Sequence, residues 1–253
     1  RHDRRPRCPE ALSPPVAEGE EHDWEIIAQR DPYFGVLSSP AFRSGAITPE
    51  ARQHFYGTGD EDIARLLGWF DQDIAARPSS GRALDIGCGV GRLTHAIAKI
   101  VPAVSGYDVA ESMLAIARSE APPNADFSTT LPPGPFSWIN SYIVFQHIPP
   151  DEGLKLIEAA LSRAAPDCFL SIQITFWRDH AGPRQNIISR MRRQMVRSTG
   201  RKADGDAARL INMHDYSLNE VMRRMTAAGF SRVVVRHTNH GGHHGAWLIA
   251  RRG

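Results

Sequence analysis

Three glycines at every second position, Gly87, Gly89 and Gly91, directly follow the apolar run that ends at Ile86. Glycine lacks a Cβ, so the backbone can turn sharply here and a ligand can lie against main-chain atoms. A tight turn with a purely structural purpose is the alternative explanation of this spacing. Ligands of open α/β sheets bind at the carboxyl ends of the strands, so the loop is a candidate binding site.

Two acidic residues accompany the glycines. Asp85 precedes them, and Asp108 ends the next apolar run, on the order of 20 residues further along the chain. A carboxylate at that place can accept hydrogen bonds from both hydroxyls of a ribose. The spacing Gly-x-Gly-x-Gly differs from the Gly-x-Gly-x-x-Gly of dinucleotide-binding loops, so a pyrophosphate is not the expected ligand.

The segments around these residues alternate between strand-like and helix-like patterns, which implies parallel strands with right-handed crossovers. The last two strands are separated by residues 238–244 alone, too few for a crossover helix, so we expect them to form an antiparallel hairpin. The sequence thus predicts an α/β fold with a doubly wound, seven-stranded sheet. The expected strands are 82–87, 103–109, 125–129, 137–145, 168–176, 232–237 and 245–251, and the expected helices are 91–100, 111–119, 150–164 and 217–230.

The part of the chain before this alternation divides into two. Residues 1–21 combine prolines and charges with few large apolar side chains, which predicts a disordered tail. Residues 22–78 predict an N-terminal helical cap, in which 49–74 should form a helix, a glycine-rich break and an amphipathic helix. Residues 79–253 then form the main domain. Because the first residue is Arg1 and not Met, we expect the chain to be a processed or trimmed fragment of a longer one.

Composition excludes several classes of protein. With 42% hydrophobic and 23% charged residues, the 253-residue chain is typical of a soluble globular protein. A net charge of +2 is too small to indicate a nucleic-acid partner. Cys8, Cys88 and Cys168 fit neither a metal-ligand spacing nor a closed disulfide set, which indicates reduced thiols and a cytoplasmic protein. No apolar run approaches the ~20 residues of a membrane helix, so we expect no stable membrane insertion.

Together the runs LDIGCGVGRL, SGYDVAESML and FSWINSYIVFQHIP resemble the class I S-adenosylmethionine-dependent methyltransferases, from about Phe55 to the end of the chain. The resemblance implies a Rossmann-like sheet and S-adenosylmethionine as cofactor. It also implies that the glycines line the methionine part, that Asp85 helps to hold its amino group and that Asp108 binds the ribose. The residues expected to bind the cofactor are Asp85, Gly87, Cys88, Gly89, Gly91, Asp108, Val109, Met113, Phe127 and Ser128.

Two departures from the family pattern concern adenine recognition. The family usually carries an acidic residue near the end of the third strand, where this chain reads DFSTT, and we place the adenine contact at Phe127 or Ser128 instead. The family commonly opens the fourth strand with Phe-Asp, where this chain has Phe136 and Ser137. Val109 and Met113 are expected to flank the adenine ring, although either residue could equally belong to the core.

Candidate catalytic residues are histidines. His147, beside Gln146 after the fourth strand, would face the methyl-transfer region in the resembling family, or would simply hydrogen-bond the backbone. His240, His243 and His244 follow a strand that should end at the ligand edge of the sheet. A neutral imidazole there could take a proton from an acceptor hydroxyl. A solvated loop and a metal site are the alternatives for this group, and we predict no metal.

Residues 178–215 form a long insertion, and long connections tend to be lids or binding elements. Ile187, Ile188, Met191 and Met195 would share one helical face, with several arginines directed away from it. A lid over the pocket, a plain surface helix, and contact with an anionic partner are the three interpretations. The remaining candidate substrate contacts are Tyr33 and Tyr56 of the cap, Gln146, Arg178 and His244.

We therefore expect an enzyme that transfers a methyl group from S-adenosylmethionine to a hydroxyl, or an amine, of a small molecule. The basic insertion favours an anionic acceptor such as a sugar or glycan precursor, and a natural-product phenol fits nearly as well. In-line methyl transfer needs alignment, desolvation and sometimes a base, so no conspicuous catalytic dyad is required. The alternative is a non-catalytic cofactor-binding or scaffold module of the same fold within a larger protein.

Overall fold

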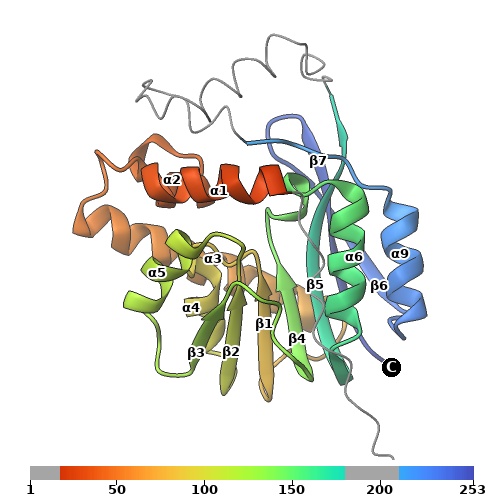
Figure 1. The fold of residues 1–253 in the computed structure, drawn as a ribbon. Coiled ribbons are helices and arrows are strands. Elements are labelled where there is room, and N and C mark those ends of the chain that lie inside the picture. Colours follow the sequence, from red (N-terminus) through yellow and green to blue (C-terminus); the bar gives the residue numbers. More distant parts are fainter. Residues whose placement is uncertain (1–17, 180–210) are drawn as a thin grey trace, which may run out of the picture.

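One seven-stranded sheet, in the order β3-β2-β1-β4-β5-β7-β6, organises the part of the chain that the structure describes (Figure 1). The structure is a computed structural model that describes residues 18–179 and 211–253. β1 to β5 run parallel, and β7 is antiparallel to both β5 and β6. This confirms the expected fold class. The strands are β1 (Arg82–Ile86), β2 (Ala103–Tyr107), β3 (Ala125–Ser128), β4 (Phe136–Ser141), β5 (Ala164–Arg178), β6 (Val233–Asn239) and β7 (His243–Arg251).

Helices cover both faces of the sheet because the central strands are apolar on both sides. α6 (Pro150–Leu161) and α9 (Leu218–Ala227) cover one face, over a core that includes Leu84 and Ile172. α3 (Pro49–Asp73) and α4 (Arg92–Ala98) cover the other face, over a core that includes Trp138. α5 (Glu111–Ser119) packs against β3 and α1.

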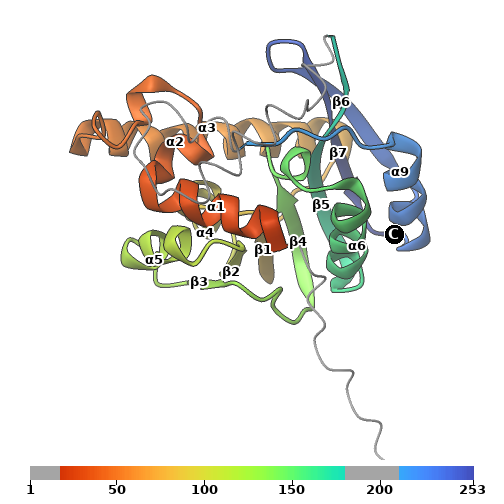
Figure 2. The same cartoon turned by 45° about the horizontal axis from the view of Figure 1, so that its top comes forward.

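The N-terminal cap consists of α1 (Glu18–Arg30), α2 (Pro32–Val36), the short 3-10 helix Pro40–Phe42 and the first half of α3. α1 begins at Glu18, inside the segment predicted to be a tail, whereas residues 1–17 lie outside the described part. Figure 2 shows α1 and α2 lying across the sheet at the end where β1 gives way to its loop. No helix within residues 18–179 and 211–253 is long and apolar enough to cross a membrane.

α3 is one continuous helix, so the glycine-rich break predicted within 49–74 is wrong. Gly59 does not interrupt the helix but lets it approach α4 closely. A Cβ at this position would lie only 2.4 Å from the backbone oxygen of Arg92. Glycines within a helix-like pattern predict an interruption, but the sequence does not show which neighbouring helix a glycine contacts.

The terminal hairpin is longer than the sequence predicted. β6 continues to Asn239 and β7 begins at His243, so the connecting turn is reduced to His240–Gly242. His243 and His244 are strand residues and not members of a flexible loop. Most of the insertion predicted at 178–215, including the apolar helix face from Ile187 to Met195, lies outside the described residues.

Candidate active site

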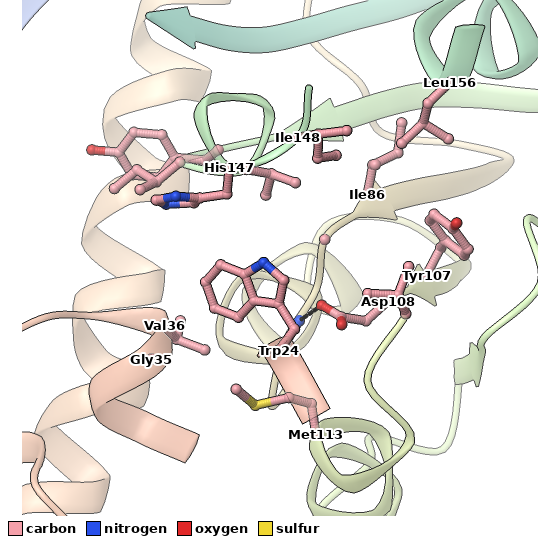
Figure 3. A pocket seen from close by; sticks show the side chains of 16 residues that line it. Trp24, Gly35, Val36, Ile86, Tyr107, Asp108, Met113, His147, Ile148 and Leu156 are labelled. Carbon is pink, nitrogen blue, oxygen red and sulfur yellow. Dashed lines mark hydrogen bonds between the residues drawn. The ribbon is translucent and has the colours of Figure 1, made fainter. Parts of the chain in front are cut away.

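A pocket lies at the carboxyl ends of β1, β2 and β4, and α1 and α2 line it from the opposite side (Figure 3). This position is the one expected for the ligand site of a doubly wound sheet. Most of the lining is apolar, and the polar side chains are few. The pocket is lined by Trp24, Gly35, Val36, Ile86, Gly87, Gly89, Tyr107, Asp108, Val109, Met113, Tyr142, Ile143, Val144, His147, Ile148 and Leu156.

Asp108 lies at the end of β2 with its carboxylate held by two backbone groups. Oδ2 accepts a hydrogen bond from the Gly89 N–H at 2.8 Å, drawn in Figure 3, and Oδ1 accepts one from Ala110 N–H at 3.0 Å. Burial raises the pKa of Asp108, and these hydrogen bonds act against that rise. The residue predicted to follow the glycines by about 20 positions is thus fixed directly to their loop.

Asp85 lies beneath the glycine loop and is only 2% exposed. Its Oδ2 accepts from Thr94 Oγ1 at 2.7 Å, and its Oδ1 accepts from Asn140 Nδ2 at 2.9 Å. Burial raises the pKa of Asp85 to about 6, against the opposing effect of these two hydrogen bonds. The carboxylate is therefore held rigidly at the base of the loop, in a second cavity that adjoins the first.

The two cavities adjoin, since Val36, Gly87, Tyr142 and Ile143 line both. Arg92 lines the second cavity together with Asp85, so a guanidinium cation and a carboxyl group share its wall. The larger cavity contains the Asp108 carboxylate, which can bind ribose hydroxyls, and the smaller one contains the opposite charges of Asp85 and Arg92. Two such neighbouring cavities suit a nucleoside joined to an amino acid.

The glycine loop is crowded by the chain's own valines. At Gly87 (φ +70°) a Cβ would lie 2.4 Å from Val144 Cγ1, and at Gly89 (φ +53°) it would lie 2.6 Å from Val36 Cγ2. Both valines line the pocket. The glycines are therefore required by a positive φ and by these side chains, in addition to any ligand.

His147 lies in the pocket wall opposite Trp24, whose ring meets the imidazole edge-on at 5.2 Å. Its Nδ1 lies 2.7 Å from the carbonyl oxygen of Asn212, which can only accept, so Nδ1 carries the proton. Its Nε2 lies 3.3 Å from Gln146 Nε2. Gln146 is buried beside the pocket, where its Oε1 accepts from Thr175 Oγ1 at 3.2 Å.

Of the predicted cofactor residues, the structure brings Gly87, Gly89, Asp108, Val109 and Met113 into the first cavity, and Asp85 and Cys88 into the second. The other predicted residues lie elsewhere. Gly91 precedes α4, and a Cβ there would meet His95 and Phe127. Phe127 also packs over Gly106, and the Ser128 side chain accepts from Thr130 N–H, so neither lines a cavity.

Three of the predicted substrate contacts do not reach the pocket. Tyr33 packs edge-on to Phe55 within the cap. Tyr56 donates a hydrogen bond to Val90 O at 3.1 Å, and so fastens α3 to the glycine loop. Arg178 is already paired, with Nε and Nη2 at 2.9–3.0 Å from the Asp215 carboxylate. These side chains stabilise the surroundings of the pocket.

The hairpin histidines lie outside both cavities. The hairpin does begin at the ligand edge, but β7, which carries His243 and His244, lies two strand positions from β4, roughly 10 Å at ordinary spacing. His244 Nε2 lies 2.9 Å from Asp179 Oδ1, and its Nδ1 lies 3.0 Å from His237 Nε2. His240 instead lies near the Tyr142 ring, at 6.4 Å. Within the described ranges, no group of three or more His, Cys, Asp or Glu side chains is placed to hold a metal ion.

Sequence reasoning missed the residues that the cap and the fourth strand contribute. Trp24, Gly35 and Val36 come from α1 and α2, and Tyr142 and Val144 follow β4. Figure 3 shows Trp24 between His147 and Met113, near the centre of the pocket. The sequence did contain a signal: Trp24 lies beside Ile26 and Ile27 in a helix that is otherwise largely charged. A large apolar group on such a helix indicates that this face packs against another part of the protein or a ligand.

Comparison with known proteins agrees with this architecture. The family of proteins described as "Methyltransferase domain" matches residues 83–167, which run from β1 into β5 and contain the glycine loop. The ubiquinone biosynthesis O-methyltransferase of Bordetella bronchiseptica is 31% identical over 115 residues, 42% of this chain and 47% of that protein. The enzyme of the same name from Ruegeria pomeroyi is 44% identical over 59 residues, 22% of this chain and 24% of that protein. The match thus spans about half the length of these curated relatives, or less.

Solved structures share the whole fold at low sequence identity. Magnesium protoporphyrin IX methyltransferase from Synechocystis PCC 6803, with bound S-adenosylmethionine, has a TM-score of 0.56 at 17% identity, covering 91% of this chain and 97% of that one. The amino pentose methyltransferase CalS10 from Micromonospora echinaspora has a TM-score of 0.54 at 18% identity, covering 82% and 98%. With the glycine loop, Asp108 at the end of β2 and the antiparallel β7 all in place, residues 83–167 match the methyltransferase-domain family and the chain has the fold of these S-adenosylmethionine-dependent methyltransferases.

Proposed function

We propose that this protein binds S-adenosylmethionine across its two adjoining cavities and transfers the methyl group to a hydroxyl of a small molecule. The observation that carries the proposal is the Asp108 carboxylate, fixed to the Gly89 N–H at the end of β2 and lining the larger cavity. An acid in this place can bind both ribose hydroxyls. The family to which residues 83–167 belong supports the same activity.

The residues present fit this cofactor. Val109 and Met113 give the larger cavity an apolar wall suited to adenine, with Asp108 beside them for the ribose. Asp85, at the base of the glycine loop, gives the smaller cavity a negative charge suited to the ammonium group of the methionine part. When bound, S-adenosylmethionine supplies a methyl group already activated by its sulfonium.

His147 is the residue that we propose as the general base. With Nδ1–H held by the Asn212 carbonyl, its basic nitrogen is Nε2. Gln146 directs its amide nitrogen towards Nε2 because Thr175 donates to the other end of the amide. These hydrogen bonds fix the imidazole in one tautomer. Because Nε2 has a single lone pair, the long contact from Gln146 must give way when Nε2 takes the proton of an acceptor hydroxyl as its oxygen accepts the methyl group.

The acceptor is best described as a hydroxyl on an apolar or aromatic body. Trp24, Val36 and Ile148 surround His147 with apolar surface, and no Lys or Arg lines the larger cavity within the described residues. Arg178, a predicted substrate contact with a positive charge, is paired with Asp215. The names of the curated relatives favour an oxygen acceptor in the same way. We therefore favour a phenol over a sugar phosphate or an amine.

The first test is calorimetric titration of the protein with S-adenosylhomocysteine, followed by transfer of tritium from methyl-labelled S-adenosylmethionine to catechols, sugar phosphates and primary amines. We expect binding, and transfer to catechols above all. A folded sample that binds no cofactor contradicts the proposal and supports the non-catalytic alternative.

Replacing His147 by Gln tests the base. We expect kcat to fall about 10²- to 10⁴-fold, the usual contribution of general-base catalysis, with S-adenosylhomocysteine affinity unchanged within a few-fold. The matched control is His54→Gln, which alters an exposed histidine of α3 outside both cavities. Equal kcat values for the His147 variant and the control would rule out the role of His147.

A further inference from the structure

Arg92 is a buried cation with an unused hydrogen-bond donor in the wall of the smaller cavity. The side chain is 3% exposed, and its Nε makes no hydrogen bond within the part of the chain that the structure describes. A buried donor without a partner destabilises the folded protein, and a ligand that accepts from it would remove that cost. The function proposed above gives Arg92 no role.

The cap holds this cation in place. Arg92 Nη1 donates to Asp62 Oδ2 at 2.6 Å and to Thr58 Oγ1 at 3.2 Å, both on α3. The guanidinium carbon also lies 5.9 Å from the centre of the Tyr142 ring, which lines both cavities. One edge of the guanidinium is therefore fixed to α3, while the side chain also lines the smaller cavity.

The charges of the smaller cavity match an α-amino acid. Asp85 and Arg92 both line it, and each is almost fully buried. An ammonium group has a partner in Asp85, and a carboxylate has a partner in Arg92, whose guanidinium is suited to bind it. The cavity shares Gly87 with the larger one, so a ligand could extend from one to the other past the glycine loop.

We propose that Arg92 binds the carboxylate of the methionine part of S-adenosylmethionine, and that Asp62 and Thr58 of α3 position it for this purpose. The inference rests on the proposed function, since it assigns one end of the same ligand. It makes the cap helix α3 a part of the cofactor site, although α3 itself lines neither cavity.

The test compares two ligands that differ only in the carboxylate, S-adenosylhomocysteine and its decarboxylated analogue, by calorimetry on the full chain. For wild type we expect the carboxylate to improve affinity about 10- to 100-fold, the effect of one hydrogen-bonded charge pair. In Arg92→Met we expect S-adenosylhomocysteine to bind that much more weakly, and the analogue to bind within threefold of wild type. The preference for the carboxylate should then disappear.

Arg65→Met is the matched control, because Arg65 also pairs with Asp62 but is half exposed and lines neither cavity. It should keep the full preference, whereas Asp62→Asn, which removes the ion pair between α3 and Arg92, should lose part of it. An Arg92 variant that binds both ligands more weakly by the same factor shows a structural role and overturns the inference. A preference for the carboxylate that is the same in Arg92→Met as in wild type also overturns the inference. Wild-type protein that binds neither ligand contradicts the proposed function itself, which separates the two failures.

Discussion

At the scale of single residues, the two carboxylates of the site differ in how they are held. The Asp108 carboxylate accepts hydrogen bonds from two backbone N–H groups, those of Gly89 and Ala110. The Asp85 carboxylate instead accepts from the side chains of Thr94 and Asn140. Asp108 thus has two functions, because the same carboxylate shapes the loop and is offered to the ligand.

Replacing Asp108 by Ala should therefore affect both binding and folding. We expect S-adenosylhomocysteine affinity to fall at least about 100-fold, since two charge-assisted hydrogen bonds to the ribose are lost. We also expect the free energy of unfolding to fall by about 1–3 kcal/mol, because the Gly89 and Ala110 N–H groups lose their acceptor. Calorimetry and urea unfolding measure the two effects. Asp126→Asn, at an exposed carboxylate of β3, is the control that should leave affinity unchanged.

At the scale of elements, α3 is the connection between the cap and the sheet. Tyr56 of α3 donates a hydrogen bond to the glycine loop, and Asp62 of α3 pairs with Arg92 of α4. Gly59 allows α3 and α4 to approach closely. Its glycines therefore have unequal roles. Gly59 faces the backbone of α4, whereas Gly57 and Gly68 have no other atom within 4 Å of an added Cβ.

Substituting Ala at each glycine separates these roles. Gly59→Ala should lower the free energy of unfolding by about 1–3 kcal/mol, because the new methyl group would overlap the Arg92 carbonyl. Gly57→Ala and Gly68→Ala should raise it by about 0.5–1 kcal/mol, the gain from replacing glycine within a helix. Chemical denaturation measures all three. If the three variants behave alike, the close approach of α3 and α4 is not what requires glycine.

Local signals in the sequence were enough for the strands and for the loop with Asp85 and Asp108, because glycine spacing and apolar runs depend only on neighbours along the chain. They were not enough for Trp24 and Val36, whose place in the pocket depends on how α1 and α2 cross the sheet. The hairpin histidines show the same limit. The hairpin turn lies at the correct edge of the sheet, but only strand order reveals that β5 stands between the hairpin and β4.

At the scale of the whole molecule, the buried acid beneath the loop should make folding depend on pH. The pKa of Asp85 is raised to about 6 in the folded protein from an ordinary 3.8. Between these values the folded state binds the proton and the unfolded state does not, so Asp85 lowers the free energy of unfolding as pH rises. Its effect is complete above about pH 6.

Urea unfolding of wild type and Asp85→Asn between pH 4 and pH 7.5 tests this dependence. The difference in free energy, wild type minus variant, should fall with a slope of up to about 1.4 kcal/mol per pH unit until pH 6 and then stay constant. The pKa of Glu25 is shifted in the opposite direction, because hydrogen bonds from Ser112 lower it in spite of burial. Glu25 is present in both proteins, so its contribution cancels when the two free energies are subtracted. A difference that is constant with pH would show that Asp85 is not buried as described.

The walls of the pocket have separate origins along the chain. The lower wall, with Gly87, Asp108 and His147, belongs to the sheet and its loops, and Trp24 and Val36 of α1 and α2 form the roof. The roof and the lower wall are therefore encoded in different stretches of sequence, and the roof reaches both cavities through Val36. On the proposed function, exchanging residues 18–48 for those of another cap would reshape the roof over acceptor and cofactor alike and leave Asp85, Asp108 and His147 in place.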